Sequence, residues 1–143
     1  MEAQRIIMNY TTPPSVEDFE ALSSNILQSI PDELSRHCDG IGIIVEDMVD
    51  EAIQADLNLD DPFDILALYK SGKAISPGIE KKVAEADDVL VLYRRSLLDM
   101  WCETEDDLQL LIRQVIIEEL GRYFEFSEED IQEMSDRHYQ GML

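Results

Sequence analysis

Residues 107–131 constrain the fold of this chain more than any other stretch. They read DLQLLIRQVIIEELGRYFEFSEEDI, and apolar residues recur at spacings of three and four, the period of a buried helical face. The residues on that face are Leu108, Ile112, Ile116, Leu120 and Tyr123. Four more, Leu110, Leu111, Val115 and Ile117, extend the apolar surface nearly all the way round. The pattern predicts a long core helix that ends at about Phe124 and is followed by an acidic turn.

Charged residues interrupt the second half of this helix. At 100° per residue, Glu118, Arg122 and Glu125 continue the apolar stripe of Val115, and Glu119 lies beside it. Charges in line with an apolar stripe are costly unless they are paired. The simplest interpretation is an exposed C-terminal half, stabilised by a Glu118–Arg122 pair at i,i+4.

The segment EELGRYF, which begins at Glu118, resembles the active-site helix of the minimal zincin-like metallopeptidases. These are small bacterial proteins in which this helix reads H-E-x-G-H-H-F-G. Glu119 matches the catalytic glutamate of that family, and Gly121 and Phe124 match its glycine and phenylalanine. Glu118 stands at the position of the first metal-binding histidine, and Arg122 stands at the position of the second.

Two further positions match the site of this family. Tyr123 stands where the family has an additional histidine, and Glu128 stands where it has an acidic third ligand. Glu125 lies between them and would neighbour the same cleft. Other segments resemble family segments in the same order, namely Ser29–Leu34, Val45–Asp47, Asp61–Tyr69 and Leu92–Arg95. The resemblance covers roughly residues 16–134 and implies a zincin-like fold.

The residues at the ligand positions change what such a site can bind. In H-E-x-x-H, two histidines present neutral imidazoles to Zn²⁺, and the glutamate acts as general base on the metal-bound water. Arg122 cannot be a ligand, because a guanidinium has no acceptor lone pair and stays protonated. Glu118 can ligate a hard cation, but carboxylates alone do not favour Zn²⁺. The resemblance therefore implies a family member without the zinc cofactor, in which Glu119 keeps the general-base position but has no activated water.

Arg122 would have a structural role if the charged stripe faced the cleft. It would then lie among Glu118, Glu125 and Glu128, and its guanidinium would replace the metal as the cation that ties the helix to the next turn. Breaking a buried pair of this kind costs roughly 3–5 kcal/mol, because a charge is left unpaired. An exposed pair contributes only about 0–1 kcal/mol.

Three functional hypotheses follow. The first is a zincin-like protein that has lost zinc binding and catalysis and is retained to bind or regulate a protein or peptide. The second is an active metallopeptidase whose metal is held by Glu118, Glu128 and a third group. The third is an acidic interaction protein for basic partners, since the chain has 32 acidic and 11 basic residues and a formal net charge of −21.

The composition excludes several other classes of protein. A net charge of −21 argues against binding to nucleic acid or to an anionic membrane. No stretch approaches the roughly 20 apolar residues that a membrane span needs, and no signal peptide is visible. The two cysteines, Cys38 and Cys102, have no metal-binding spacing and fit reduced thiols in a cytoplasmic protein. The two histidines, His37 and His138, are not at ligand spacing from each other or from Glu118.

The remaining elements predict an α+β fold. Residues 1–14 read as an N-terminal arm, and residues 15–143 as a single zincin-like domain. Ser15 with Asp18 should cap a first helix. Apolar runs predict strands at Gly40–Glu46, Asp64–Tyr69 and Asp88–Arg94, which would form a small mixed sheet of three or four strands.

The other connections are predicted from caps and composition. The acidic segment 47–61 reads as a loop, and Ser96–Trp101 as a short helix. Thr104 should be the N-cap of the long helix, and Ser127 should cap a final helix that runs to His138. Arg94 and Arg95 either pair with part of the acidic excess or serve as solubilising surface residues, and the second is the simpler interpretation.

Overall fold

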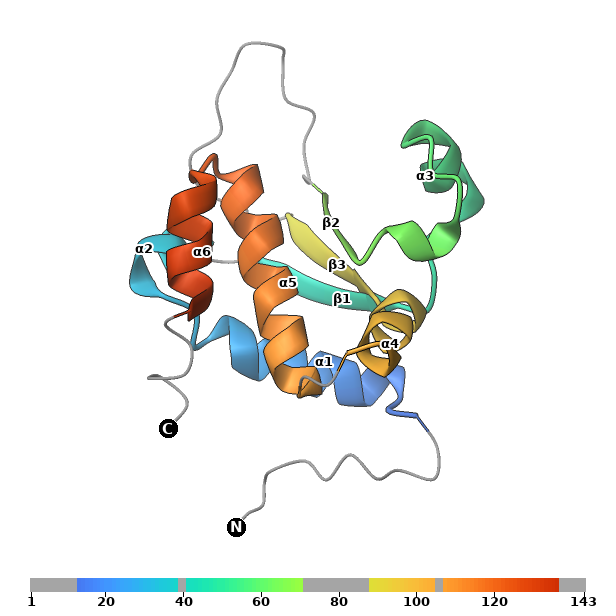
Figure 1. Ribbon diagram of the computed structural model, residues 1–143, viewed down its shortest axis with the longest axis horizontal. Helices are drawn as coiled ribbons and strands as arrows, with labels where there is room; N and C mark the ends of the chain where they lie inside the picture. Colours follow the sequence, from blue (N-terminus) through green and yellow to red (C-terminus); the bar gives the residue numbers. More distant parts are fainter. Residues whose placement is uncertain (1–12, 39–40, 71–87, 105–106, 137–143) are drawn as a thin grey trace.

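The computed structural model describes residues 13–38, 41–70, 88–104 and 107–136 of the chain (Figure 1). Its helices are α1 (Val16–Leu27), α2 (Asp32–Ser35), α3 (Glu51–Asp56), α4 (Arg94–Cys102), α5 (Leu108–Tyr123) and α6 (Glu128–Asp136), and a 3₁₀ turn, η1, spans Pro62–Asp64. The strands are β1 (Gly42–Glu46), β2 (Ala67–Lys70) and β3 (Val89–Tyr93). The prediction of an α+β single domain is confirmed.

The sheet is mixed, with β3 as its central strand and the order β1-β3-β2. β1 runs parallel to β3, with Gly42 opposite Val89, and β2 runs antiparallel, with Ala67 opposite Leu92. β3 reads VLVLY, a continuous apolar run typical of a strand buried on both faces. The described strands therefore form the predicted small mixed sheet, and β2 is one of its edges.

Helices α1 and α5 pack against one face of this sheet (Figure 1). Alternate strand residues, such as Val45, Leu90 and Leu92, point into the core between them. Four of the five residues on the predicted apolar face of α5, Leu108, Ile112, Ile116 and Leu120, have 0% exposure, and the fifth, Tyr123, is half-buried. The prediction of a long core helix is confirmed, and its C-terminal half lies beside β2.

A smaller cluster covers the opposite face of the sheet. Val49, Val91 and Tyr93 are buried there, and Ile53 of α3 packs against them. The sequence analysis placed a loop at 47–61, and this was wrong where α3 forms. Asp50 caps α3 by accepting a hydrogen bond from the Ile53 N–H at 2.8 Å. No residue of α3 is buried, which explains why its apolar pattern is weak.

The second strand is shorter than predicted. Its first residue, Asp64, is the last residue of η1 instead, where Asp61 accepts a hydrogen bond from the Phe63 N–H at 2.9 Å and Pro62 occupies the first position. Ile65 then returns to extended backbone, with φ −115° and ψ 128°, before β2 begins at Ala67. The strand therefore begins at Ala67, after an extended Ile65 and a bend at Leu66.

The N-cap predicted for the long helix was also wrong. Asp107 is the cap, since its carboxylate accepts a hydrogen bond from the Gln109 N–H at 2.8 Å. Thr104 instead donates its hydroxyl to the Trp101 carbonyl at the end of α4, at 3.3 Å. The predicted cap of the final helix is confirmed, because Ser127 Oγ accepts from the Asp130 N–H at 3.0 Å. His138 lies outside the described residues.

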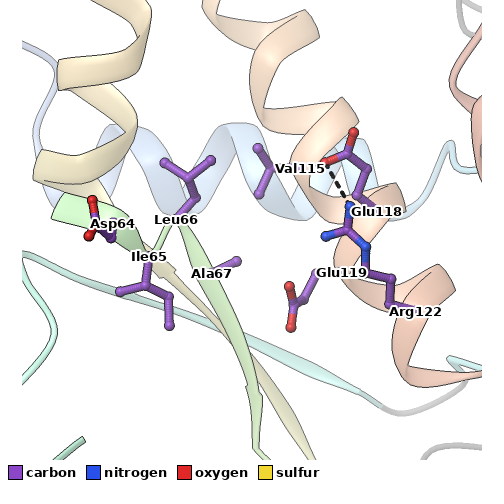
Figure 2. Close-up of a pocket in the computed structure, with 8 residues that line it drawn as sticks. All are labelled: Asp64, Ile65, Leu66, Ala67, Val115, Glu118, Glu119 and Arg122. Carbon is purple, nitrogen blue, oxygen red and sulfur yellow. Dashed lines mark ion pairs between the residues drawn. The ribbon is translucent and has the colours of Figure 1, made fainter. Parts of the chain in front are cut away.

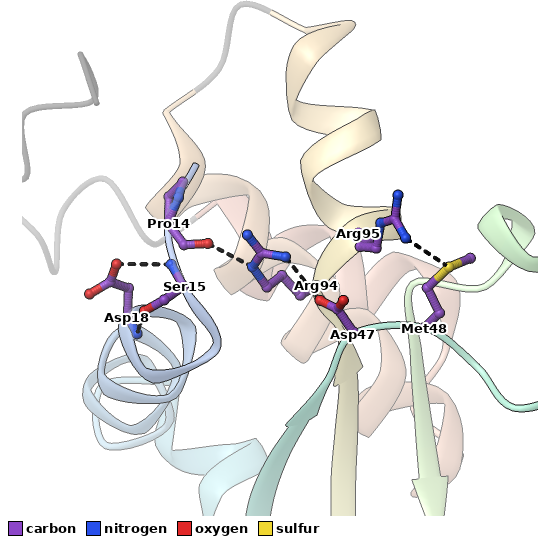
Figure 3. Close-up of polar contacts among 7 residues, drawn as sticks. All are labelled: Pro14, Ser15, Asp18, Asp47, Met48, Arg94 and Arg95. Carbon is purple, nitrogen blue, oxygen red and sulfur yellow. Dashed lines mark hydrogen bonds and ion pairs between the residues drawn. The ribbon is translucent and has the colours of Figure 1, made fainter. Parts of the chain in front are cut away.

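Arg94 joins the N-terminal side of the domain to the sheet (Figure 3). Its Nε donates to the Pro14 carbonyl at 2.7 Å, and its Nη1 lies 2.9 Å from Asp47 Oδ1. Only 19% of its side chain is exposed, so its interpretation as a solubilising residue was wrong. Next to Pro14, Ser15 and Asp18 form the predicted capping box of α1. Of the proposed N-terminal arm, residues 1–12 lie outside the described part.

Candidate functional site

A cavity of about 210 Å³ lies between the beginning of β2 and the C-terminal half of α5 (Figure 2). One wall comes from the segment that leads into β2, and the other from consecutive turns of α5. The lining residues are Asp64, Ile65, Leu66, Ala67, Val115, Glu118, Glu119 and Arg122. Three of the six predicted site residues, Glu118, Glu119 and Arg122, are thus brought to one cavity.

Glu119 reaches from α5 to the edge of the sheet. It is half-buried, and its carboxylate accepts a hydrogen bond from the backbone N–H of Tyr69 in β2. Burial raises the pKa of Glu119, and the nearby Glu118 carboxylate raises it further. The positive charge of Arg122 and the Tyr69 N–H lower that pKa but do not cancel the effect of burial. Glu119 is therefore a carboxyl whose charge is disfavoured by its surroundings.

The backbone groups of β2 alternate in direction, toward β3 and toward the edge that faces away from β3. The Tyr93 N–H donates to the Leu66 carbonyl at 3.0 Å, so Leu66 forms a hydrogen-bonded pair with β3. In an antiparallel pair the next residue points its N–H and C=O the other way. Ala67 and Tyr69 therefore direct these groups away from β3. Within the described part of the chain, no hydrogen bond reaches the outward groups of Ala67, and this residue lines the cavity.

Arg122 interacts with two carboxylates across the end of α5. Its Nη2 lies 4.0 Å from Glu118 Oε1, and its Nε lies 3.8 Å from Glu128 Oε2 at the start of α6. The side chains of Arg122 and Glu128 are 56% and 79% exposed. Glu118 also accepts a hydrogen bond from the Gln114 side-chain amide at 3.2 Å. The buried interpretation of the Arg122 pair is therefore wrong: these are long, solvated contacts.

Tyr123 belongs to an aromatic cluster rather than to the cavity wall. Its ring stacks on that of Tyr69, with centroids 3.6 Å apart and planes at 13°. Phe124 packs edge-on against both rings, and His37 stacks on Phe124 at 5.4 Å. On the buried side, the Tyr69 hydroxyl donates to Asp88 Oδ2 at 2.6 Å, and burial with this bond raises the pKa of Tyr69. The cluster fixes Tyr69, whose N–H holds Glu119.

Glu125 does not line the cavity, and its role is in the backbone. It has φ 67°, in the left-handed region, directly after the C-cap Phe124. The Phe126 N–H donates to the Gly121 carbonyl at 2.8 Å, and the Glu125 N–H donates to the Arg122 carbonyl at 3.2 Å. These two bonds form a Schellman motif, in which glycine is the preferred residue at the left-handed position. The motif turns the chain from α5 into α6.

The zinc site that the family resemblance implies does not fit these residues. The guanidinium of Arg122 approaches the carboxylates of both Glu118 and Glu128, so a fixed positive charge lies between the positions from which ligands would converge. His37 stacks on Phe124. Within the described ranges, no group of three His, Cys, Asp or Glu side chains is placed to hold a metal ion. We derive no metal-dependent step from this site.

Comparison with known proteins supports the fold. The sequence matches the family model of zincin-like metallopeptidases over residues 38–138, and the chain belongs to this family. No curated protein gives a match. Among the helices of the described part, none is long and apolar enough to cross a membrane. Family membership and the cavity beside α5 together define the candidate site.

Proposed function

We propose that this protein is a non-catalytic member of the zincin-like family that binds an extended peptide segment between β2 and α5. The observation that carries the proposal is the outward-facing backbone of Ala67, which borders the cavity and has no hydrogen-bond partner among the described residues. An extended segment can add to such a strand edge through main-chain hydrogen bonds.

Loss of catalysis is supported by the chemistry of the side chains. Peptide hydrolysis by an H-E-x-x-H site needs neutral imidazoles to hold Zn²⁺ and a carboxylate to deprotonate its water. Here the corresponding positions carry Glu118 and Arg122, and an arginine is not a metal ligand. Glu119 accepts a hydrogen bond from the edge strand instead. We therefore propose that the Glu119 carboxylate helps to determine which backbone groups at the edge of β2 a peptide can use.

The Glu119 contact would also limit where a peptide can pair. The outward N–H of Tyr69 is already used by Glu119, whereas the outward groups of Ala67, a residue only 6% exposed, have no hydrogen-bond partner among the described residues. A bound segment would accordingly form hydrogen bonds with the beginning of β2. The end of β2 would stay in contact with Glu119 of α5. The stacked ring of Tyr123 holds Tyr69 in the position that this arrangement needs.

Two measurements test this function. Elemental analysis of protein purified without chelator should find far less than one zinc per chain, whereas about one zinc per chain would support an active enzyme.

Fluorescence anisotropy should detect binding of labelled seven-residue peptides of alternating valine and threonine with one variable central residue. The matched controls are the same peptides N-methylated on every second residue. This removes the N–H donors along one of the two edges of the extended peptide. If neither methylated register binds more weakly, strand addition is ruled out.

A further inference from the structure

The size of the cavity limits what can enter it. At about 210 Å³ it is smaller than the roughly 300–1,000 Å³ of typical small-molecule pockets. It is, however, large enough for a protein side chain, and one wall is the edge along which a peptide would run. A side chain of the bound segment is therefore a better match for this cavity than a free cofactor or metabolite.

The charges in the cavity favour a cation. Asp64 borders the cavity on the side of β2, and Glu118 and Glu119 border it on α5, so acidic residues lie on both walls. Among the described residues that line the cavity, Arg122 is the one positive group, and it is shared with Glu128 outside the cavity. In the described part of the chain, no ion pair reaches the carboxylate of Asp64. An added positive charge would meet more negative than positive groups.

The rest of the lining suits a long aliphatic stem. Val115 is buried and Leu66 is half-buried, and both border the cavity between the two acidic walls. Lysine and arginine combine such a stem with a charged end, and they commonly pack the stem on apolar surface. The net charge of −21 would in addition attract cationic segments and raise their association rate.

From these features we infer that the cavity recognises a lysine or arginine side chain of the extended segment bound along β2. The inference rests on the proposed peptide-binding function and gives it a specificity. The stem lies against Val115 and Leu66, and the charged end lies between Asp64 and Glu119. Binding of the cation also compensates the carboxylate of Glu119, whose charged form is disfavoured by burial in the free protein.

The experiment compares the valine–threonine peptides with central lysine, arginine, norleucine or glutamate. Lysine and arginine peptides should bind about tenfold more tightly than the norleucine peptide. The double variant Asp64→Asn plus Glu119→Gln should remove most of that preference. Glu20→Gln, an exposed carboxylate on α1 away from the cavity, is the matched charge control and should leave the preference unchanged.

The possible outcomes separate the two proposals. If norleucine and lysine peptides bind equally well, the cation preference is refuted while peptide binding stands. If no peptide binds to the folded protein, both proposals fail. If Glu20→Gln lowers the preference as much as Asp64→Asn alone or Glu119→Gln alone, the effect is general charge attraction and the cavity is not the recognition site. Unfolding curves of every variant show whether it is folded.

Discussion

Gly121 and Ile131 are in such close contact that a Cβ atom built on the glycine would lie 2.6 Å from Ile131 Cγ1 and 2.9 Å from its Cδ1. The two residues join α5 to α6, and Ile131 is only 3% exposed. This close approach gives a physical reason for glycine in the middle of EELGRYF. It keeps the start of α6, and with it Glu128, near the end of α5.

Gly121→Ala should destabilise the protein by about 1–3 kcal/mol through overpacking, even though alanine favours the helix by up to about 1 kcal/mol. Ile131→Ala removes the two closest atoms and leaves Cβ at 3.8 Å, an ordinary contact. The double variant should thus be more stable than the sum of the two single effects predicts. Urea unfolding of all four proteins gives this coupling energy. Strict additivity would contradict the proposed contact.

Arg122→Ala should cost less than about 1 kcal/mol. Both of its ion pairs are near the 4.0 Å limit of such contacts, and more than half of its side chain is exposed. Urea unfolding at neutral pH measures the loss, with Glu20→Ala, an exposed charged residue on α1, as control. A loss of 3 kcal/mol or more, as expected for a buried pair, would show that the guanidinium ties α5 to α6 after all.

Glu125→Gly should leave the protein as stable as wild type or make it more stable, by up to about 1 kcal/mol. A left-handed backbone costs a residue with a side chain roughly 1–2 kcal/mol, and glycine adopts it without that penalty. Part of the gain is lost because glycine is freer in the unfolded chain. Thermal unfolding would measure the change, and Glu125→Ala should show none of it. A clear loss of stability in Glu125→Gly would mean that its carboxylate has a partner.

Glu119 should make the stability depend on pH in a defined direction. Its pKa is raised above the ordinary 4.5, so the folded state binds this proton more tightly than the unfolded state. That contribution to stability is complete below about pH 4 and is lost as the pH rises through the raised pKa. Glu119→Gln stays neutral, and its amide oxygen can still accept from the Tyr69 N–H.

The glutamine variant should consequently be more stable than wild type at neutral pH, by about 0.5–2 kcal/mol. The difference should vanish below about pH 4, where Glu119 is protonated in both states. Unfolding by urea from acid to neutral pH checks this. A difference that stays constant over the whole range would show that the substitution acts through packing rather than through charge.

Glu118→His combined with Arg122→His should create zinc binding. The present side chains at positions 122 and 128 come within 3.8 Å, and those at 118 and 122 within 4.0 Å, so the three positions face a common point. Two imidazoles and the Glu128 carboxylate form a ligand set that Zn²⁺ accepts. Calorimetry should detect zinc in the double variant and not in Arg122→His alone. A folded double variant without zinc binding would show that Glu128 is misplaced.

Local patterns made part of this structure predictable. The helical period of α5, the apolar run of β3 and the Ser15 cap of α1 are set by neighbours in sequence, and all were predicted. The N-cap of α5 was not predicted, because threonine and aspartate both cap helices well and local sequence does not decide between Thr104 and Asp107. Packing decides between them: Leu108 is 0% exposed, and the helix begins where that side chain enters the core.

The contacts between distant segments could not be predicted in this way. The hydrogen bond from Tyr69 to Asp88 and the approach of Glu119 to β2 depend on how the sheet and α5 pack, and no local spacing encodes them. The i,i+4 pattern indicated the Glu118–Arg122 pair but not its exposure. One charged residue within the apolar pattern of α5 was overlooked. Arg113 lies three residues before Ile116 on the apolar face, and it is only 4% exposed.

The position of β3 at the centre of the sheet also sets an order of events during synthesis. Both of its neighbours, β1 and β2, precede it in the chain, and in the described structure neither pairs with the other. A nascent chain that ends before Val89 therefore lacks the one strand that pairs with either of them among the described strands. Since pairing of Gly42 with Val89 also closes a long stretch of chain, the sheet should form late and comparatively slowly. Until then, Ile43 and Val45 depend on α1 or on a chaperone to be shielded from water.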